Sequence, residues 1–88
     1  MGTMKIIDSI RTSTCEALQS GRLVRSATFV RRSEARDVAA AQRVAVCAAW
    51  RARSALRRGF HLSAAREAEV ASTAAREVAL ACKVARVG

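Results

Sequence analysis

The side chains in this sequence that could do chemistry are mostly guanidinium groups. The 88 residues include 16 Lys and Arg against 7 Asp and Glu, a formal net charge of +9, and fourteen of these cations are arginine. Arginine presents a planar fork of N–H donors that matches carboxylate or phosphate, whereas lysine is a point charge. The composition therefore favours contacts with an anionic partner, although a GC-rich genome would give the same excess of Arg and Ala.

The positive charge is concentrated in the middle of the chain. Residues 22–58 carry ten Arg and two acids, whereas residues 1–21 are neutral overall and residues 59–88 carry a net charge of +1. A field confined to one segment fits a docking surface better than general solubilisation. In a helix, one side gathers Arg36, Arg43, Arg51 and Arg58 together with Trp50. This side is either a solvated face or a surface for RNA, anionic lipid or an acidic protein. The candidate anion- or partner-binding residues are Arg36, Arg43, Trp50, Arg51, Arg53, Arg57 and Arg58.

Cysteine and histidine give no second kind of site. Cys15, Cys47 and Cys82 are odd in number, widely spaced and without a CxxC pair, which argues against a disulfide scaffold and a zinc site. Each is expected to be a small buried residue in a reducing compartment. His61 is the only histidine, and we expect it in a turn or on the surface. We predict no metal and no cofactor.

Motifs of catalysis and of base recognition are absent. The sequence has no Gly-rich phosphate loop, no HExxH and no GxSxG, so we predict that the protein is not an enzyme. The aromatic residues Phe29, Trp50 and Phe60 are too scattered to form a stacking platform. Nucleic-acid binding would therefore depend on contacts between Arg and phosphate.

The arginines lie in a segment that predicts a long helix over 34–58. Ser33 is a plausible N-cap, Glu34 is an acid in the first turn, and Gly59 follows the last Arg, as expected just beyond a helix end. The opposite side of this helix is apolar but shallow, because most of it is alanine, and we expect it to pack closely on another helix. Its residues are Val38, Ala41, Ala45, Ala48, Ala52, Ala55 and Leu56.

A second long Ala-rich helix is predicted over 64–87, after a turn at 59–63. Ser63 is its expected N-cap, and Phe60 and Leu62 are expected to fold back onto the apolar side as a plug. The residues expected to form its narrow apolar strip are Val70, Ala74, Val78, Ala81 and Ala85.

The N-terminal segment predicts a shorter amphipathic helix at about 4–19. Its apolar positions recur at helical spacing, and Gly21 is a reasonable stop. Residues 22–32 favour a helix continuous with the central one, with a short strand as the alternative. The sequence therefore predicts one small all-α domain spanning 1–88, a hairpin of two long helices with the shorter helix packed across it. The apolar positions of the predicted 4–19 helix are Ile6, Ile7, Ile10, Thr14, Ala17 and Leu18.

Bulky apolar residues are few. The chain holds twenty Ala but only nineteen Leu, Ile, Val and Phe together. Alanine removes little surface from water, so we expect the chain to fold marginally alone or to be held by a partner. No uncharged run approaches the roughly 20 residues that a membrane-spanning helix needs.

One short motif bears on location. Residues 58–63 read Arg-Gly-Phe-His-Leu-Ser, an R-x-F-x-x-S pattern that resembles the processing site of mitochondrial presequences. The residues before it are rich in Arg, Ala and Ser and poor in acids, as transit peptides are. This resemblance implies a mitochondrial location, and the alternative is another intracellular reducing compartment.

Three interpretations of function remain open. The first is a small basic accessory or structural subunit that docks onto a larger protein or ribonucleoprotein assembly through its Arg-rich face. The second is an rRNA- or DNA-binding helical protein of the ribosomal type, which binds through Arg–phosphate contacts. The third is a reading frame without an evolved biochemical function, which the GC-rich composition suggests.

Overall fold

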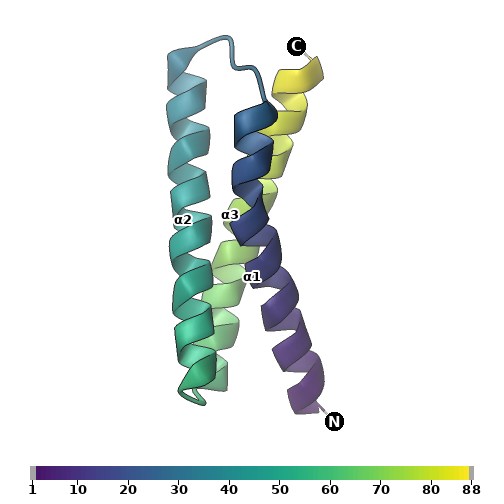
Figure 1. The fold of residues 1–88 in the computed structure, drawn as a ribbon, viewed down its shortest axis with the longest axis vertical. Coiled ribbons are helices and arrows are strands. Elements are labelled where there is room, and N and C mark those ends of the chain that lie inside the picture. The colour runs from purple at the N-terminus through teal and green to yellow at the C-terminus, as the bar shows by residue number, and fades with distance from the viewer. Residues whose placement is uncertain (1, 88) are drawn as a thin grey trace.

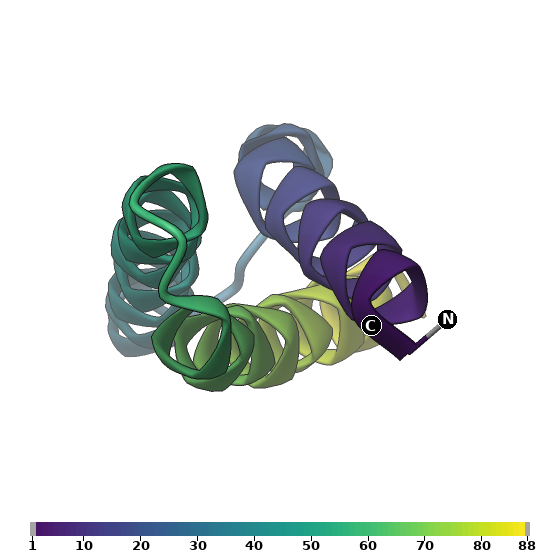
Figure 2. The same cartoon turned by 90° about the horizontal axis from the view of Figure 1, so that it is seen from below.

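The chain folds into three long α-helices in the computed structural model, which describes residues 2–87 and the side chains of residues 4–85. The helices are α1 (Gly2–Ser26), α2 (Arg32–Arg57) and α3 (His61–Val87). Each contacts the other two. Figure 1 shows α2 running antiparallel to α3, with α1 leaning across α3. In the end-on view of Figure 2, the helices form a triangle in which α3 runs across the bottom, beneath both α1 and α2. The bundle measures 45 × 19 × 15 Å.

The predicted all-α class and the hairpin of two long helices are confirmed, but the N-terminal helix is as long as its neighbours, so the predicted short helix at 4–19 is wrong. Gly21 does not stop α1, which continues to Ser26. A Cβ built on Gly21 would lie 3.4 Å from Nε2 of Gln42, so the glycine sits where α1 approaches α2. Packing of this face outweighs the low helix propensity of glycine, which costs about 1 kcal/mol. The correct description is a three-helix bundle.

The connection between α1 and α2 lies at residues 27–31, so residues 22–32 are neither a strand nor part of one continuous helix. Arg31 occupies the N-cap position of α2, with extended backbone angles (φ −112°, ψ 140°) and no side-chain capping bond. The expected cap, Ser33, lies inside the first turn. The first turn is therefore supported by Glu34 and the helix dipole, without a hydroxyl cap.

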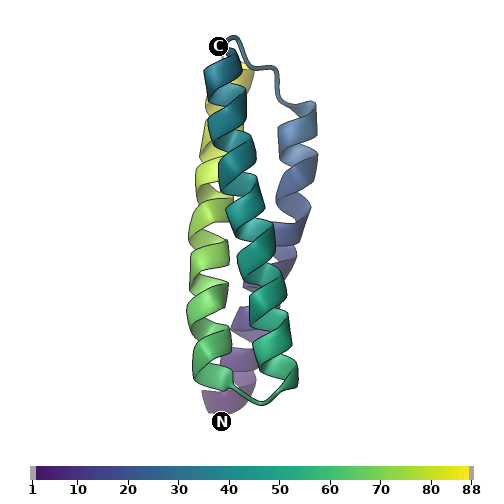
Figure 3. The same cartoon turned by 90° about the vertical axis from the view of Figure 1, so that its left-hand side faces the viewer.

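The turn between α2 and α3 is shorter than predicted. Gly59 adopts a positive φ of 83°, which confirms the expected helix end. The amide of Phe60 donates to the Ala55 carbonyl (2.9 Å) and that of Gly59 to the Leu56 carbonyl (3.1 Å), the two bonds of a Schellman motif. Because α3 already begins at His61, Ser63 lies within it and is not its cap. Figure 3 shows this turn at the end of the bundle where the N-terminus lies.

All three helices bury residues at alternating spacings of three and four, an average of 3.5. This repeat is the pattern of left-handed coiled-coil packing. The positions are Ile7, Ile10, Thr14, Ala17, Gly21 and Val24 in α1, Val38, Ala41, Ala45, Ala48, Ala52 and Ala55 in α2, and Ala64, Ala68, Ala71, Ala75, Val78 and Cys82 in α3, all buried or half-buried.

Alanine dominates the middle of the core. The central cluster consists of Ala17, Ala45, Ala48, Ala49, Ala71, Ala74 and Ala75, with Leu18 packed against it. Bulkier residues enter toward the two ends, where Ile10 packs near Leu56 and Val38 packs near Val78. The stripe predicted for α2 is therefore confirmed as buried or half-buried throughout.

In the strip predicted for α3, Ala74 and Val78 are buried and Ala81 and Ala85 are half-buried. Only Val70 fails, because the buried side is rotated toward Ala71 and Ala75. Val70 is 48% exposed, whereas Ala71, Ala75 and Cys82 are buried. The reason is that α3 packs on both α1 and α2, so its buried arc is centred between two neighbours. The predicted plug is also wrong, since Phe60 and Leu62 are exposed. Of the apolar positions predicted for α1, only Ile6 is exposed.

No helix within the described residues is both long enough and apolar enough to cross a membrane.

Candidate functional site

A straight row of exposed side chains runs along the outside of α2. Arg36, Arg43, Trp50 and Arg57 recur every seven residues, opposite the buried stripe, and all four are exposed. With a rise of 1.5 Å per residue, neighbours in this row are about 10.5 Å apart. We call these four residues the outer row. Of the face predicted from the sequence, Arg36, Arg43 and Trp50 lie in this row and are exposed, and Arg57 completes the row without having been predicted there.

Arg51 and Arg58 lie on the flank of the outer row, and both are exposed. The Nε of Arg51 lies 3.8 Å from Oε2 of Glu67 in α3, which is the single ion pair among the described residues. The same Nε donates to the Cys47 carbonyl oxygen at 3.4 Å. An exposed pair of this kind contributes about 0–1 kcal/mol. The positive charge of α2 is therefore left largely unneutralised within the described residues.

Arg53 lies on the other flank, held against the indole of Trp50. Its guanidinium carbon is 5.6 Å from the ring centroid, and the Trp50 side chain is half exposed. Such a cation–π contact contributes about 0.5–1 kcal/mol at an exposed site. It also fixes the direction of the half-buried Arg53 side chain. Trp and Arg are the residue types that most often dominate binding energy at protein interfaces.

Arg53 and Arg57 also line a cleft between α1 and α2, which we call the α1–α2 cleft. Arg11 of α1 joins them there, with a cavity volume of about 370 Å³. Ile10 and Thr14 are buried beneath it. The remaining lining residues are Cys15 and Leu56, and no acid is among them.

Sequence reasoning missed Arg11 as a site residue. It belongs to the electrically neutral N-terminal segment, far along the chain from Arg53, and only the packing of α1 on α2 brings the two together. Its position beside Ile10, on the flank of the apolar stripe of α1, is the one signal that the sequence offered.

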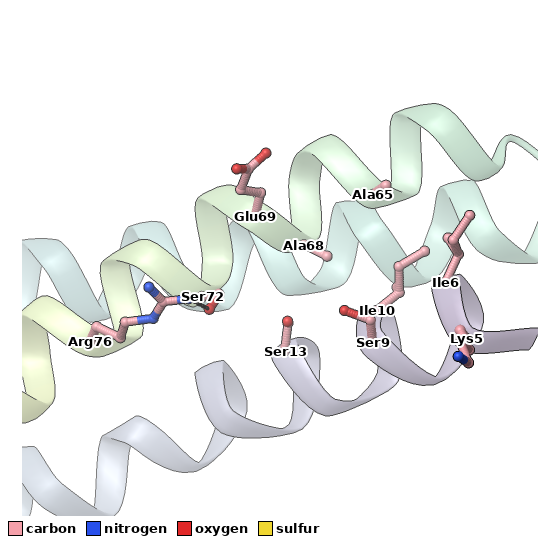
Figure 4. Close-up of a pocket in the computed structure, with 10 residues that line it drawn as sticks. All are labelled: Lys5, Ile6, Ser9, Ile10, Ser13, Ala65, Ala68, Glu69, Ser72 and Arg76. Carbon is pink, nitrogen blue, oxygen red and sulfur yellow. Dashed lines mark hydrogen bonds between the residues drawn. The ribbon is translucent and has the colours of Figure 1, made fainter. Parts of the chain in front are cut away.

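The other clefts carry charges of both signs. The cleft drawn in Figure 4, between α1 and α3, has a volume of about 450 Å³. Ser9 and Ser13 point from α1 toward α3 there, and Nη2 of Arg76 donates to Oγ of Ser72 at 3.1 Å. Glu69 lines the same cleft and points away from α1.

A third cleft, of about 380 Å³, is lined by both Glu16 and Arg22. A fourth, of about 700 Å³, lies where the 27–31 connection meets the end of α3. It is mainly apolar, with Arg31, Glu34 and Glu77 among its lining residues. Of the four clefts, only the α1–α2 cleft has cations without an acid.

Two of the three cysteines are exposed, which corrects the prediction that all are buried. Cys15 and Cys47 are exposed and Cys82 is buried. The described residues contain no cluster of His, Cys, Asp and Glu that could hold a metal ion. His61, the first residue of α3, is half-buried and lines none of the four clefts.

Comparison with known proteins found no matching family model, no matching curated protein and no matching solved structure.

Proposed function

We propose that this chain is a small basic structural subunit that docks through the outer face of α2 onto an acidic surface of a larger protein or ribonucleoprotein assembly. The observation that carries the proposal is the outer row. Three arginines and one tryptophan occupy it at a constant spacing, and none of the three arginines has an ion-pair partner within the described residues. A field of one sign steers an oppositely charged partner and orients it.

The apolar surface supports a role as a component. Several large apolar side chains are strongly exposed, including Val30 (87%) and Leu62 (81%). The buried core, by contrast, is mostly alanine, which removes little area from water per residue. A chain with a thin core gains stability by mass action when a partner binds the folded form.

A role other than catalysis is part of the proposal. The single histidine lies outside the four clefts, and the α1–α2 cleft holds three cations with no carboxylate to act as a base. General acid–base catalysis needs a group that gains and loses a proton near the working pH, and arginine does not do so.

We also propose a mitochondrial location. The R-x-F-x-x-S motif spans the turn between α2 and α3, where Phe60 and Leu62 are exposed. Fractionation of cells that express the chain with a C-terminal tag tests this part. Recovery of the tagged chain outside organelles contradicts it.

The docking experiment compares two double variants that lose the same charge. Arg36→Gln/Arg43→Gln removes half of the outer row, whereas Arg22→Gln/Arg25→Gln removes two exposed arginines of α1. Size fractionation of native extracts measures the share of each variant in large complexes. We expect the wild type and the α1 variant in high-mass fractions, and the α2 variant shifted toward the free chain. Equal behaviour of the two variants contradicts docking through α2.

Nucleic acid is the second candidate, because the α1–α2 cleft gathers three arginines without an acid. Ribonuclease treatment separates the two candidates: it releases the chain if RNA is the partner and leaves a protein complex intact. Affinity for a nucleic acid also falls steeply between about 50 and 200 mM salt, when several phosphate contacts release counterions. If the wild type migrates as a free monomer under all conditions, both candidates are wrong. The chain would then be a reading frame without a binding function.

A further inference from the structure

We infer that the α1–α2 cleft is a binding site for a phosphate group, held by Arg11, Arg53 and Arg57. This inference deepens the proposed function and rests on it, because it names the chemistry of a group that the basic side of α2 receives. The three arginines come from two helices and line a single cavity of about 370 Å³.

The charge of the cleft is uncompensated. Arg53 and Arg57 are one helical turn apart on α2, a spacing at which like charges repel. Arg11 adds a third positive charge from α1, and no lining residue is acidic. The two acids nearest to Arg11 in sequence lie outside the cleft. Asp8 is not among its lining residues, and Glu16 lines the third cleft together with Arg22. A bound anion removes this repulsion.

The floor of the cleft strengthens electrostatic binding. Ile10 and Thr14 are 2% and 1% exposed, and Leu56 packs against the same cluster. The hydroxyl of Thr14 already donates to the Arg11 carbonyl oxygen at 2.9 Å, so the guanidinium groups are the available donors. Water is excluded from one side of the site, and charge interactions gain strength where the effective dielectric constant is low.

One of the three arginines is held in place before any ligand binds. The contact of Arg53 with Trp50 restricts its side chain at the edge of the cleft. Ordering a long side chain on binding costs affinity, so this contact lowers the entropic cost. Trp50 also offers a spectroscopic reporter, because an anion bound to Arg53 changes the electrostatic environment of the indole ring in contact with it.

Phosphate fits this set of donors better than carboxylate does. A phosphate monoester carries up to two negative charges and three terminal oxygens, which matches three guanidinium groups, whereas a carboxylate offers one charge and two oxygens. Each guanidinium donates in a bidentate fork that suits phosphate geometry. Free phosphate and the headgroup of a phosphate-bearing lipid share this chemistry.

The experiment titrates the full-length chain with inorganic phosphate and with pyrophosphate, followed by NMR of the Arg Nε–H groups and the Trp50 indole N–H. We expect saturable shifts at Arg11, Arg53 and Arg57. Arg11→Gln should weaken binding about tenfold, because a hydrogen bond to a charged group is lost. Arg25→Gln is the matched control: it removes the same charge from an exposed position of α1 outside the cleft and should change affinity less than about twofold. Arg11→Lys keeps the charge without the fork and should bind with intermediate affinity.

Equal loss in the Arg11 and Arg25 variants overturns the inference, because net charge alone would then explain binding. Shifts spread evenly over Arg36 and Arg43 overturn it as well. Circular dichroism of each variant checks that the helices remain formed. A second arm uses phosphatidylcholine vesicles with and without phosphatidic acid. Binding that requires phosphatidic acid and is lost in Arg11→Gln supports a lipid headgroup, and phosphate binding without vesicle binding supports a free phosphate.

Failure of this site and failure of the docking proposal are distinguishable. The Arg36→Gln/Arg43→Gln variant keeps all three arginines of the cleft. If it loses assembly binding but still binds phosphate, both proposals stand. If the wild type joins the assembly but no phosphate binds, the docking proposal stands and the phosphate site is wrong.

Discussion

Val78→Ala tests the packing of α3 directly. Val78 is among the largest fully buried side chains of the chain, at 0% exposure, whereas Val70, eight residues earlier in the same helix, is 48% exposed. The same substitution at both positions therefore compares a core residue with a surface residue under equal changes in helix propensity. The sequence alone placed both residues on one apolar strip, so the pair also separates the two descriptions of α3.

The magnitude follows from burial. Val→Ala removes about two methylene equivalents, worth about 1.6 kcal/mol when fully buried. The cavity that remains adds up to about 1 kcal/mol, and the better helix propensity of alanine offsets about 0.5 kcal/mol. The expected loss for Val78→Ala is thus about 2 kcal/mol. At Val70 the smaller burial term and the propensity term nearly cancel, so we expect a change within about 0.5 kcal/mol.

Such a loss is large for this protein. At about 0.05 kcal/mol per residue, the low end for natural domains, the whole chain has a stability near 4 kcal/mol. Thermal and urea unfolding followed by circular dichroism at 222 nm measures both variants. We expect Tm to fall by about 8–16 °C for Val78→Ala and by little for Val70→Ala. Equal losses at the two positions would refute the rotation of α3 and favour the strip predicted from the sequence.

Three further predictions concern other parts of the fold. Gly21→Ala should stabilise α1 by about 0.5–1 kcal/mol, because the new Cβ meets only flexible side-chain atoms at 3.4 Å and beyond. Gly59→Ala should lower the free energy of unfolding by about 1 kcal/mol, because alanine is strained at a φ of 83°. Urea unfolding measures both variants. Ala71→Leu inserts a larger side chain into the central alanine cluster and should lower the free energy of unfolding by about 1–3 kcal/mol. Ala79→Leu, on the exposed side of α3, should leave stability nearly unchanged. Equal effects at the two positions would mean that the helices are not closely packed. Glu67→Gln removes the ion pair with Arg51 and should change stability by less than about 1 kcal/mol, so a larger loss would show that this exposed pair matters more than its geometry indicates.

The parts of the fold that depend on one helix at a time were predictable. The buried stripe of α2 follows from its own periodicity, and the end of α2 follows from Gly59, whose positive φ closes the Schellman motif. The outer row follows from the same periodicity. These features need no knowledge of the neighbouring helices.

The errors lie where two helices decide the outcome together. Gly21 is a helix breaker in isolation, yet it lies inside α1 at the approach to Gln42. Val70 is more apolar than Ala71, yet α3 turns Ala71 inward because it must contact both neighbours. Arg11 became a site residue only through the packing of α1 on α2. Local propensity is a weak prior at such positions, and tertiary packing overrides it.

The seven-residue repeat connects the core with the candidate site. In a straight helix of 3.6 residues per turn, positions seven apart drift by about 20° per repeat, so Arg36 and Arg57 would diverge by roughly 60°. Helices whose small residues repeat every 3.5 positions follow a left-handed supercoil, which removes this drift relative to the bundle. Such a supercoil in α2 would keep the outer row on one side for roughly 32 Å. If the chain docks as proposed, a flat acidic surface would meet all four residues at once, and a change that pushes the helices apart should weaken docking even though it touches no arginine.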